Sequence, residues 1–148
     1  DIIMKNGGTI DKYMGDCIMA FWNAPIDTKN HKELAIKSAL EMIDKLKELN
    51  ENNGFGDNNK LNIGIGINSG KAVVGNMGSE QRFDYSVLGD AVNLASRLEG
   101  VSKNYDATLV VGEDTYKDVA TQFNFKKLDD VQVKGKTEKV SIYSIYTN

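Results

Sequence analysis

Glycines in the segment IGIGINSG, residues 63–70, constrain the fold of this chain more than any other short feature. Gly64 and Gly66 alternate with isoleucines, so the segment has the two-residue period of a β-strand but lacks side chains on one face. It is not a phosphate-binding loop, because the GxxxxGKS/T pattern is missing and Ser69 stands where a dinucleotide fingerprint needs its third glycine. We therefore predict a thin strand that another element approaches closely.

Composition places the chain among ordinary globular domains. It has 148 residues, of which 41% are hydrophobic and 26% charged, and this length is typical of one domain. The formal net charge is −3 with both signs mixed along the chain, and no basic stripe indicates binding to nucleic acid. The single cysteine, Cys17, favours a reducing compartment and hence a cytoplasmic location. Because the chain begins with Asp1 rather than Met, we expect it to be part of a longer protein.

Helical and strand patterns alternate along the sequence. Two β-rich runs, 9–14 and 17–22, are joined by Gly15-Asp16, which is typical of a hairpin turn. This alternation favours an α+β fold in which helices pack against one mixed sheet. Further strands are predicted at 61–68, 71–74, 83–88, 108–111, 131–134 and 140–146, and helices at about 30–50, from Asp90 to Leu98, and at 113–120.

The segment YSVLGDAVNLASRLEG, residues 85–100, changes from a strand to an amphipathic helix at Gly89. Asp90 is placed to N-cap this helix. The apolar stripe of the helix consists of Ala91, Leu94, Ala95 and Leu98. Asn93 and Arg97 lie one turn apart beside that stripe. They are either solvated surface residues, with Arg97 solvated or paired with a nearby acid, or parts of a functional site.

Three further polar side chains are candidates for chemistry. Asp16, in the predicted hairpin turn, is either a simple turn residue or a carboxylate ligand of the kind that Mg²⁺ prefers. Lys12 alternates with Ile10 and Met14, so we expect it to share a face with both of them. It is either an edge-strand lysine in solvent or a donor in a partly apolar cleft. Lys134, in the motif VKGK, is a turn residue or a phosphate donor.

Three segments together resemble the class III nucleotidyl cyclase catalytic domain, the family of adenylate and guanylate cyclases. They are GGTIDKYMGDCIMAFW (7–22), GNMGSEQRFDYSVLGDAVNLASRLE (75–99) and VKGK (133–136). The resemblance runs from about Gly7 to Tyr146. It implies a single catalytic domain over residues 1–148, of α+β class, with a ferredoxin-like core and helices packed on a mixed sheet.

The resemblance also implies a metal site. In this family, two aspartates hold two Mg²⁺ or Mn²⁺ ions, and the second aspartate matches Asp16. The first lies in an upstream strand with a pattern like FxDIxGF, and nothing in this sequence matches it. We therefore expect the domain to lack its N-terminal strand here, and residues 1–148 alone to be inactive.

The same resemblance assigns roles to the other candidates. Lys12 and Ser86 match the purine-selecting pair, in which a lysine with Asp, Thr or Ser is the adenylate cyclase pattern. Asn93 matches the residue that orients the ribose, and Arg97 matches the one that stabilises charge on the reacting α-phosphate. Lys134 matches the lysine that contacts the terminal phosphates.

The activity so implied is conversion of ATP to 3′,5′-cyclic AMP and pyrophosphate, by attack of the ribose 3′-hydroxyl on the α-phosphate. In the family, the site forms between two catalytic domains in a head-to-tail homodimer or heterodimer. We also expect an upstream regulatory domain, with a membrane tether elsewhere in the protein left open. The alternative is a degenerate, non-catalytic module for nucleotide binding or dimerisation. A purely structural domain would leave the segment 75–99 unexplained.

Overall fold

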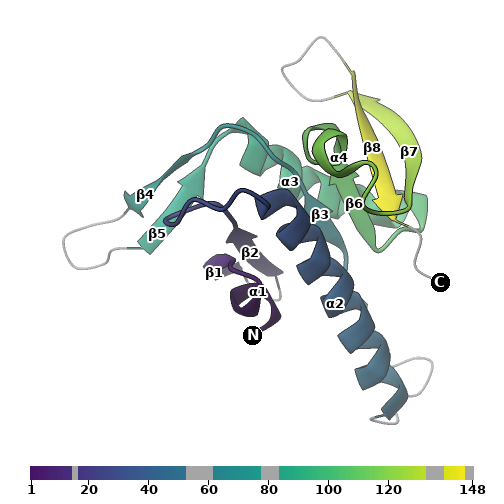
Figure 1. The fold of residues 1–148 in the computed structure, drawn as a ribbon. Coiled ribbons are helices and arrows are strands. Elements are labelled where there is room, and N and C mark those ends of the chain that lie inside the picture. Colours follow the sequence, from purple (N-terminus) through teal and green to yellow (C-terminus); the bar gives the residue numbers. More distant parts are fainter. Residues whose placement is uncertain (15–16, 53–61, 78–83, 133–138, 146–148) are drawn as a thin grey trace.

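The computed structural model describes residues 1–14, 17–52, 62–77, 84–132 and 139–145, and their arrangement is drawn in Figure 1. The described residues confirm the α+β class. Its helices are α1 (Ile2–Lys5), α2 (His31–Asn52), α3 (Asp90–Val101), the 3₁₀ helix η2 (Ser102–Tyr105) and α4 (Glu113–Val119). Its strands are β1 (Thr9–Met14), β2 (Cys17–Phe21), β3 (Ile65–Ile67), β4 (Val73–Met77), β5 (Asp84–Leu88), β6 (Leu109–Gly112), β7 (Phe125–Gln132) and β8 (Lys139–Ile145).

The strands divide among three sheets within the described part of the chain. A four-stranded mixed sheet has the order β3-β6-β8-β7, with β3 and β6 parallel and the other neighbours antiparallel. The pairs β1–β2 and β4–β5 form separate antiparallel hairpins. The mixed sheet that the sequence predicts is therefore present, but it is smaller than the number of strands suggests, because two strand pairs stand apart from it.

Strand β6 is the centre of the core, because it is buried on both faces. Leu109 and Val111 pack with residues of α2 and α4, whereas Val110, which points to the opposite face, packs with Leu94 and Leu98 of α3. A strand that is covered on both faces reads as a continuous apolar run, which is the pattern LVV here. Helix α2 extends past the sheet at its C-terminal end, as Figure 1 shows.

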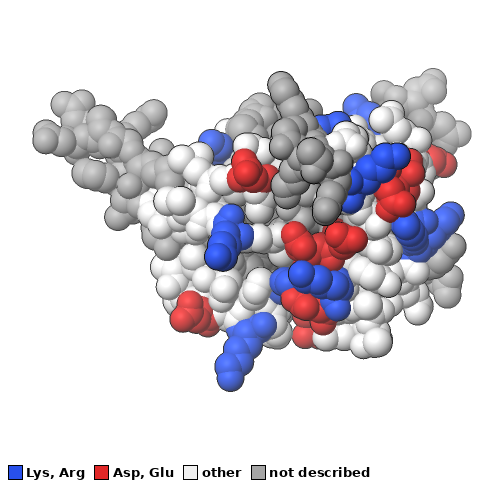
Figure 2. All heavy atoms as spheres, turned by 90° about the horizontal axis from the view of Figure 1, so that it is seen from above, with Lys and Arg blue, Asp and Glu red and all other residues white. Residues whose placement is uncertain are grey.

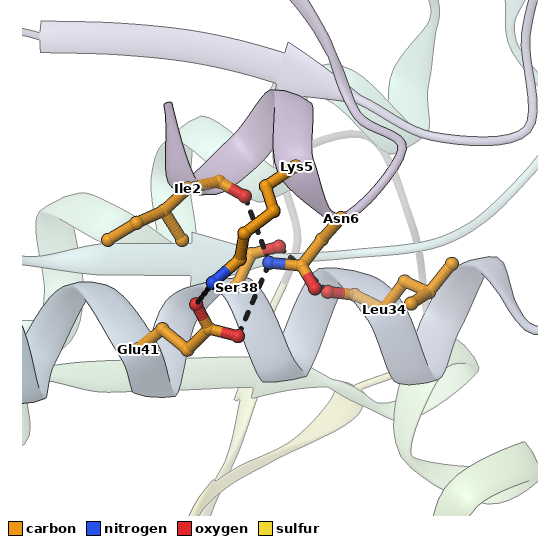
Figure 3. A network of polar contacts seen from close by, with 6 residues as sticks. All are labelled: Ile2, Lys5, Asn6, Leu34, Ser38 and Glu41. Carbon is orange, nitrogen blue, oxygen red and sulfur yellow. Dashed lines mark hydrogen bonds and ion pairs between the residues drawn. The ribbon is translucent and has the colours of Figure 1, made fainter.

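Helix α1 is held against α2 by polar contacts around Glu41, drawn in Figure 3. Lys5 Nζ lies 2.7 Å from Glu41 Oε2, and Asn6 Nδ2 donates to the other carboxylate oxygen at 3.5 Å. The hydrogen bond from Lys5 lowers the pKa of Glu41. Trp22 Nε1, just after β2, donates to the carbonyl of Asn6 at 3.1 Å. These contacts anchor both ends of the β1–β2 hairpin beside α2.

A second polar contact joins the start of α2 to α4. Lys32 Nζ donates to the carbonyl oxygen of Asp114 at 2.8 Å and also to the carboxylate of Asp118. The hydrogen bond from Lys32 lowers the pKa of Asp118. On the face of the molecule seen in Figure 2, basic and acidic side chains are interspersed rather than separated by sign. None of the helices in the described ranges is long and apolar enough to cross a membrane.

The strands predicted at 61–68 and 71–74 are β3 (Ile65–Ile67) and β4 (Val73–Met77) in the structure. The starts of α3 and of β7 also differ from prediction. Asp90 is the first residue of α3 and not its N-cap; the N-cap is Gly89, with φ 149°, and no side chain caps the helix. Gly89, in a backbone conformation that other residues rarely take, occupies the capping position, and Asp90 belongs to the first turn. The sequence predicts a strand only from residue 131, whereas β7 already starts at Phe125. The earlier residues were missed because a register shift between Lys127 and Asp129 interrupts the alternation by which a strand is recognised.

Candidate active site

Helix α3 lies directly against β3 because glycines leave no side chain between them. A Cβ atom on Gly66 would lie 2.4 Å from both the carbonyl oxygen of Ala95 and the amide nitrogen of Glu99. A Cβ atom on Gly64 would lie 2.6 Å from Ser102 Oγ. The predicted thin strand is confirmed, and the element that approaches it is the helix that carries the candidate site residues.

The residues after β3 hold the first turn of α3. Asn68 Nδ2 donates to the carbonyl oxygen of Ala91 at 3.0 Å. A Cβ atom on Gly70 would lie 2.8 Å from Ala91 Cβ, so this contact is also close. The hydroxyl oxygens of Ser69 and Thr115 lie 2.6 Å apart, which joins the same segment to α4. Sequence reasoning missed Asn68, because a lone asparagine after a strand carries no signal of a partner far along the chain.

Asn93 and Arg97 project from the exposed side of α3. Leu94 and Leu98 are buried, which confirms the apolar stripe and places the two polar side chains beside it. Among the described residues, Arg97 forms no ion pair with an acidic neighbour on the helix. Both side chains are therefore exposed to solvent and accessible to a ligand.

Lys12 lies on β1, where the pairing with β2 contains a bulge. The paired residues are Ile10 with Ala20, Lys12 with Met19, Tyr13 with Ile18 and Met14 with Cys17. Asp11 is the extra residue, so Lys12 and Ile10 face opposite sides of the hairpin. The prediction that Lys12 shares a face with Ile10 is wrong for this reason. The side chain of Met14 lies outside what the structure describes.

Ser86 lies on β5, opposite Gly75 of β4. The structure describes its backbone but not its side chain. Strand β5 contacts β1, and the amide of Val87 donates to Asp11 Oδ2 at 3.3 Å. Because Asp11 precedes Lys12 and Val87 follows Ser86, this bond brings the two predicted purine-selecting positions to adjacent strands of different hairpins.

Two predicted site residues, Asp16 and Lys134, lie outside the described residues. The strands on either side of Asp16 are β1 and β2, so the predicted hairpin is confirmed. Lys134 falls between β7 and β8, which also pair as predicted. Within the described ranges, no group of three or more histidine, cysteine and acidic side chains is arranged to hold a metal ion.

Comparison with known proteins decides the family. The sequence matches the family described as the adenylate and guanylate cyclase catalytic domain over residues 3–147. The chain belongs to this family. The resemblance carried by the segments 7–22, 75–99 and 133–136 is therefore confirmed.

Similar proteins include cyclases from several bacteria. Adenylate cyclase 1 of Rhizobium meliloti is 31% identical over 145 residues, which are 98% of this chain and 22% of that protein. Adenylate cyclase of Anabaena cylindrica is 37% identical over 147 residues, 97% of this chain and 29% of that protein. This cyclase domain thus spans less than a third of either relative. The crystal structure of the adenylyl cyclase CyaB from P. aeruginosa matches with a TM-score of 0.86 and 33% identity, covering 99% of this chain and 76% of that one.

The close contact between β3 and α3 can be tested by giving a side chain to its glycine. We expect Gly66→Ala to destabilise the cyclase domain by about 1–3 kcal/mol, because the added methyl group meets backbone atoms that cannot move away. Gly100→Ala is the matched control: Gly100 lies in α3 with nothing within 4 Å, and alanine there should stabilise by about 0.5–1 kcal/mol. Urea unfolding measures both, and equal stability of the two variants would contradict this packing.

Proposed function

We propose that this domain is an adenylate cyclase, which converts ATP to 3′,5′-cyclic AMP and pyrophosphate. The observation that carries the proposal is the placement of Lys12, Asn93 and Arg97 at accessible positions of a cyclase domain that matches its family over residues 3–147. The family description names both adenylate and guanylate cyclases, so membership alone does not select the purine. The relatives from Rhizobium meliloti and Anabaena cylindrica, which are named adenylate cyclases, support ATP.

Selection of adenine is assigned to Lys12 and Ser86. The ammonium group of a lysine only donates hydrogen bonds, and adenine N1 is an acceptor, so Lys12 fits that edge of the base. A hydroxyl group can accept from the N6 amino group, which is the role proposed for Ser86. Guanine has a donor at N1 and an acceptor at O6, so it presents the opposite pattern. The hydrogen bond from the amide of Val87 on β5 to the carboxylate of Asp11 on β1 supports the nearness of the two positions.

The chemical step is in-line attack of the ribose 3′-oxygen on the α-phosphorus, with loss of pyrophosphate. Asn93 would orient the ribose, and Arg97, one helical turn further on, would donate to the α-phosphate oxygens as negative charge grows on them. The guanidinium group suits this role because its donors form a rigid fork. Lys134 would contact the terminal phosphates. These roles account for the two polar side chains beside the apolar stripe of α3.

Catalytic domains of this family generally use a divalent metal ion. We propose two Mg²⁺ or Mn²⁺ ions in the complete site, where they would offset the charge of the triphosphate and favour ionisation of the 3′-hydroxyl. Asp16, between the paired strands β1 and β2, offers a carboxylate of the type these ions bind. The remaining ligands of the two ions would come from the triphosphate oxygens, from water and from other residues.

The site is proposed to form between two catalytic domains in a head-to-tail homodimer or heterodimer. Exposed apolar pairs on both hairpins support a partner surface: Tyr13 lies opposite Ile18, and Val73 lies opposite Leu88. These four side chains are 52–68% exposed. Arg97 and Asn93 are also accessible, as a half-site open to a partner requires. In a homodimer, Asp16 would serve the site opposite its own Arg97.

We propose that residues 1–148 are one catalytic domain of a longer cytoplasmic protein with an upstream regulatory domain. The relatives named above support the longer chain, because this domain spans only 22% and 29% of their lengths. The single cysteine, Cys17, supports a reducing compartment.

Turnover of nucleotides tests the function directly. We expect the purified full-length protein, supplied with Mn²⁺, to produce cyclic AMP from ATP faster than cyclic GMP from GTP. Product formation is measured by chromatography. Binding of a non-hydrolysable ATP analogue without any product from ATP would instead favour the non-catalytic module, and calorimetry measures that binding.

Exchange of the purine pair tests the selectivity. The double variant Lys12→Glu with Ser86→Cys should lose ATP turnover and favour GTP, because a mismatched base leaves buried polar groups unpaired at a cost of several kcal/mol. The readout is kcat/KM for ATP and for GTP. An unchanged preference for ATP in the double variant would show that Lys12 and Ser86 do not select the base.

Removal of the guanidinium group tests the chemical step. We expect Arg97→Ala to lower kcat by about 10²–10³-fold, the scale for loss of one transition-state donor, with a much smaller change in KM. Arg97→Lys should recover activity only in part, since a point charge does not reproduce the fork. Lys103→Ala, at an exposed cation beyond the end of α3, is the control and should retain full activity. A near-normal kcat in Arg97→Ala would show that Arg97 takes no part in the chemical step and that α3 is an ordinary surface helix.

A further inference from the structure

A purine is rigid, so the two groups that read its edge must keep a fixed spacing. The two positions proposed for that role, Lys12 and Ser86, belong to different hairpins, β1–β2 and β4–β5. In the described part of the chain these hairpins are separate sheets, and no ladder of backbone hydrogen bonds joins them. Their relative position must therefore depend on other contacts.

The β-bulge in β1 supplies such a contact. The register shifts between Ile10 and Lys12, which leaves Asp11 as the extra residue of the strand. A bulge redirects a side chain away from the regular alternation of its strand. The carboxylate of Asp11 here accepts a hydrogen bond from the backbone amide of Val87 on β5, with Oδ2 and N 3.3 Å apart.

Both ends of this bond are fixed in place. The side chain of Val87 is buried, at 6% exposure, and its backbone pairs with Val74 of β4. Asp11 is half-buried, and the strands next to it are β2 and β5. This hydrogen bond therefore connects two strands that no ladder joins in the described part of the chain. Each bonded residue is adjacent in sequence to one of the two selecting positions.

We infer that Asp11 is a positioning residue for nucleotide selectivity: its carboxylate fixes β1 against β5, so that Lys12 and Ser86 meet the same purine. The inference rests on the proposed function. Asp11 touches neither the base nor the phosphates in this account. Its effect passes through the backbone of β5, so its loss should change the ratio of ATP to GTP use rather than abolish turnover of both.

Three substitutions separate geometry from charge. Asp11→Asn keeps an acceptor oxygen at the same distance from the backbone but removes the negative charge. Asp11→Glu keeps the charge but moves the acceptor by one methylene. Asp11→Ala removes the acceptor. Asp44→Ala, at an exposed carboxylate on α2, is the matched control.

The experiment measures kcat/KM for ATP and for GTP in the full-length protein, with the melting temperature of each variant. We expect Asp11→Ala and Asp11→Glu to lower the ATP/GTP ratio by about tenfold, the order of one hydrogen bond, while Asp11→Asn and Asp44→Ala keep it close to the wild-type value. Binding of non-hydrolysable ATP and GTP analogues, measured by calorimetry, should show the same loss of preference.

Three outcomes are decisive against the inference. Equal losses of kcat/KM for ATP and for GTP, together with a lower melting temperature, would show that Asp11 has only a structural role. A normal ratio in Asp11→Glu with a lowered ratio in Asp11→Asn would show that charge matters and the bond geometry does not. Wild-type binding selectivity in every variant would also overturn it.

Absence of any product from the wild-type protein would instead refute the proposed function, and the binding ratios would still decide the role of Asp11. If Asp11→Ala does not fold, the Asn and Glu variants decide alone.

Discussion

The contact between β3 and α3 is the constraint on which the rest of this structure depends. At Gly66 the backbone of α3 meets the strand backbone with no side chain between them, and at Gly64, just before β3, the hydroxyl of Ser102 in η2 approaches as closely. A methyl group at either position would clash. This contact sets the height of α3 above the sheet and so the place of Asn93 and Arg97. The same contact places the apolar stripe of α3 over Val110, which belongs to β6, the strand next to β3 in the sheet. Packing, together with the hydrogen bond from Asn68 to Ala91, therefore determines where the two polar side chains lie.

The candidate site is assembled from elements of different rigidity. Helix α3 is held by the core, whereas Lys12 and Ser86 lie on hairpins outside the four-stranded sheet. The residues assigned to the chemical step thus lie on the well-packed part, and those assigned to base selection lie on parts joined by few contacts. The residues assigned to base selection are thus separated in the fold from the helix that carries the residues assigned to the chemical step.

Much of this arrangement follows from local sequence patterns. The alternation of glycine with isoleucine at 63–67 and the stripe at Leu94 and Leu98 both predicted what the structure shows, because each depends on the period of a single element. The N-cap at Asp90 was wrong because the conformation of Gly89 could not be known from its identity alone. The prediction that Lys12 shares a face with Ile10 was wrong, since a bulge adds one residue without any change in side-chain character. Asp11 and Asn68 were missed because their partners lie far away in the chain. The roles of Asp16, Ser86 and Lys134 stay predictions.

Burial of β6 on both faces has a mechanical consequence. Val110 and Val111 are neighbours in the chain, yet one packs beneath α3 and the other beneath α2. Protein interiors are nearly incompressible, so a push on one face of such a strand is not absorbed by empty space on the other. Helix α2 is in turn joined to α1 through Glu41 and to α4 through Lys32. A force applied at the N-terminal end of the chain, or along α2, would therefore be transmitted to α3 through the single strand β6.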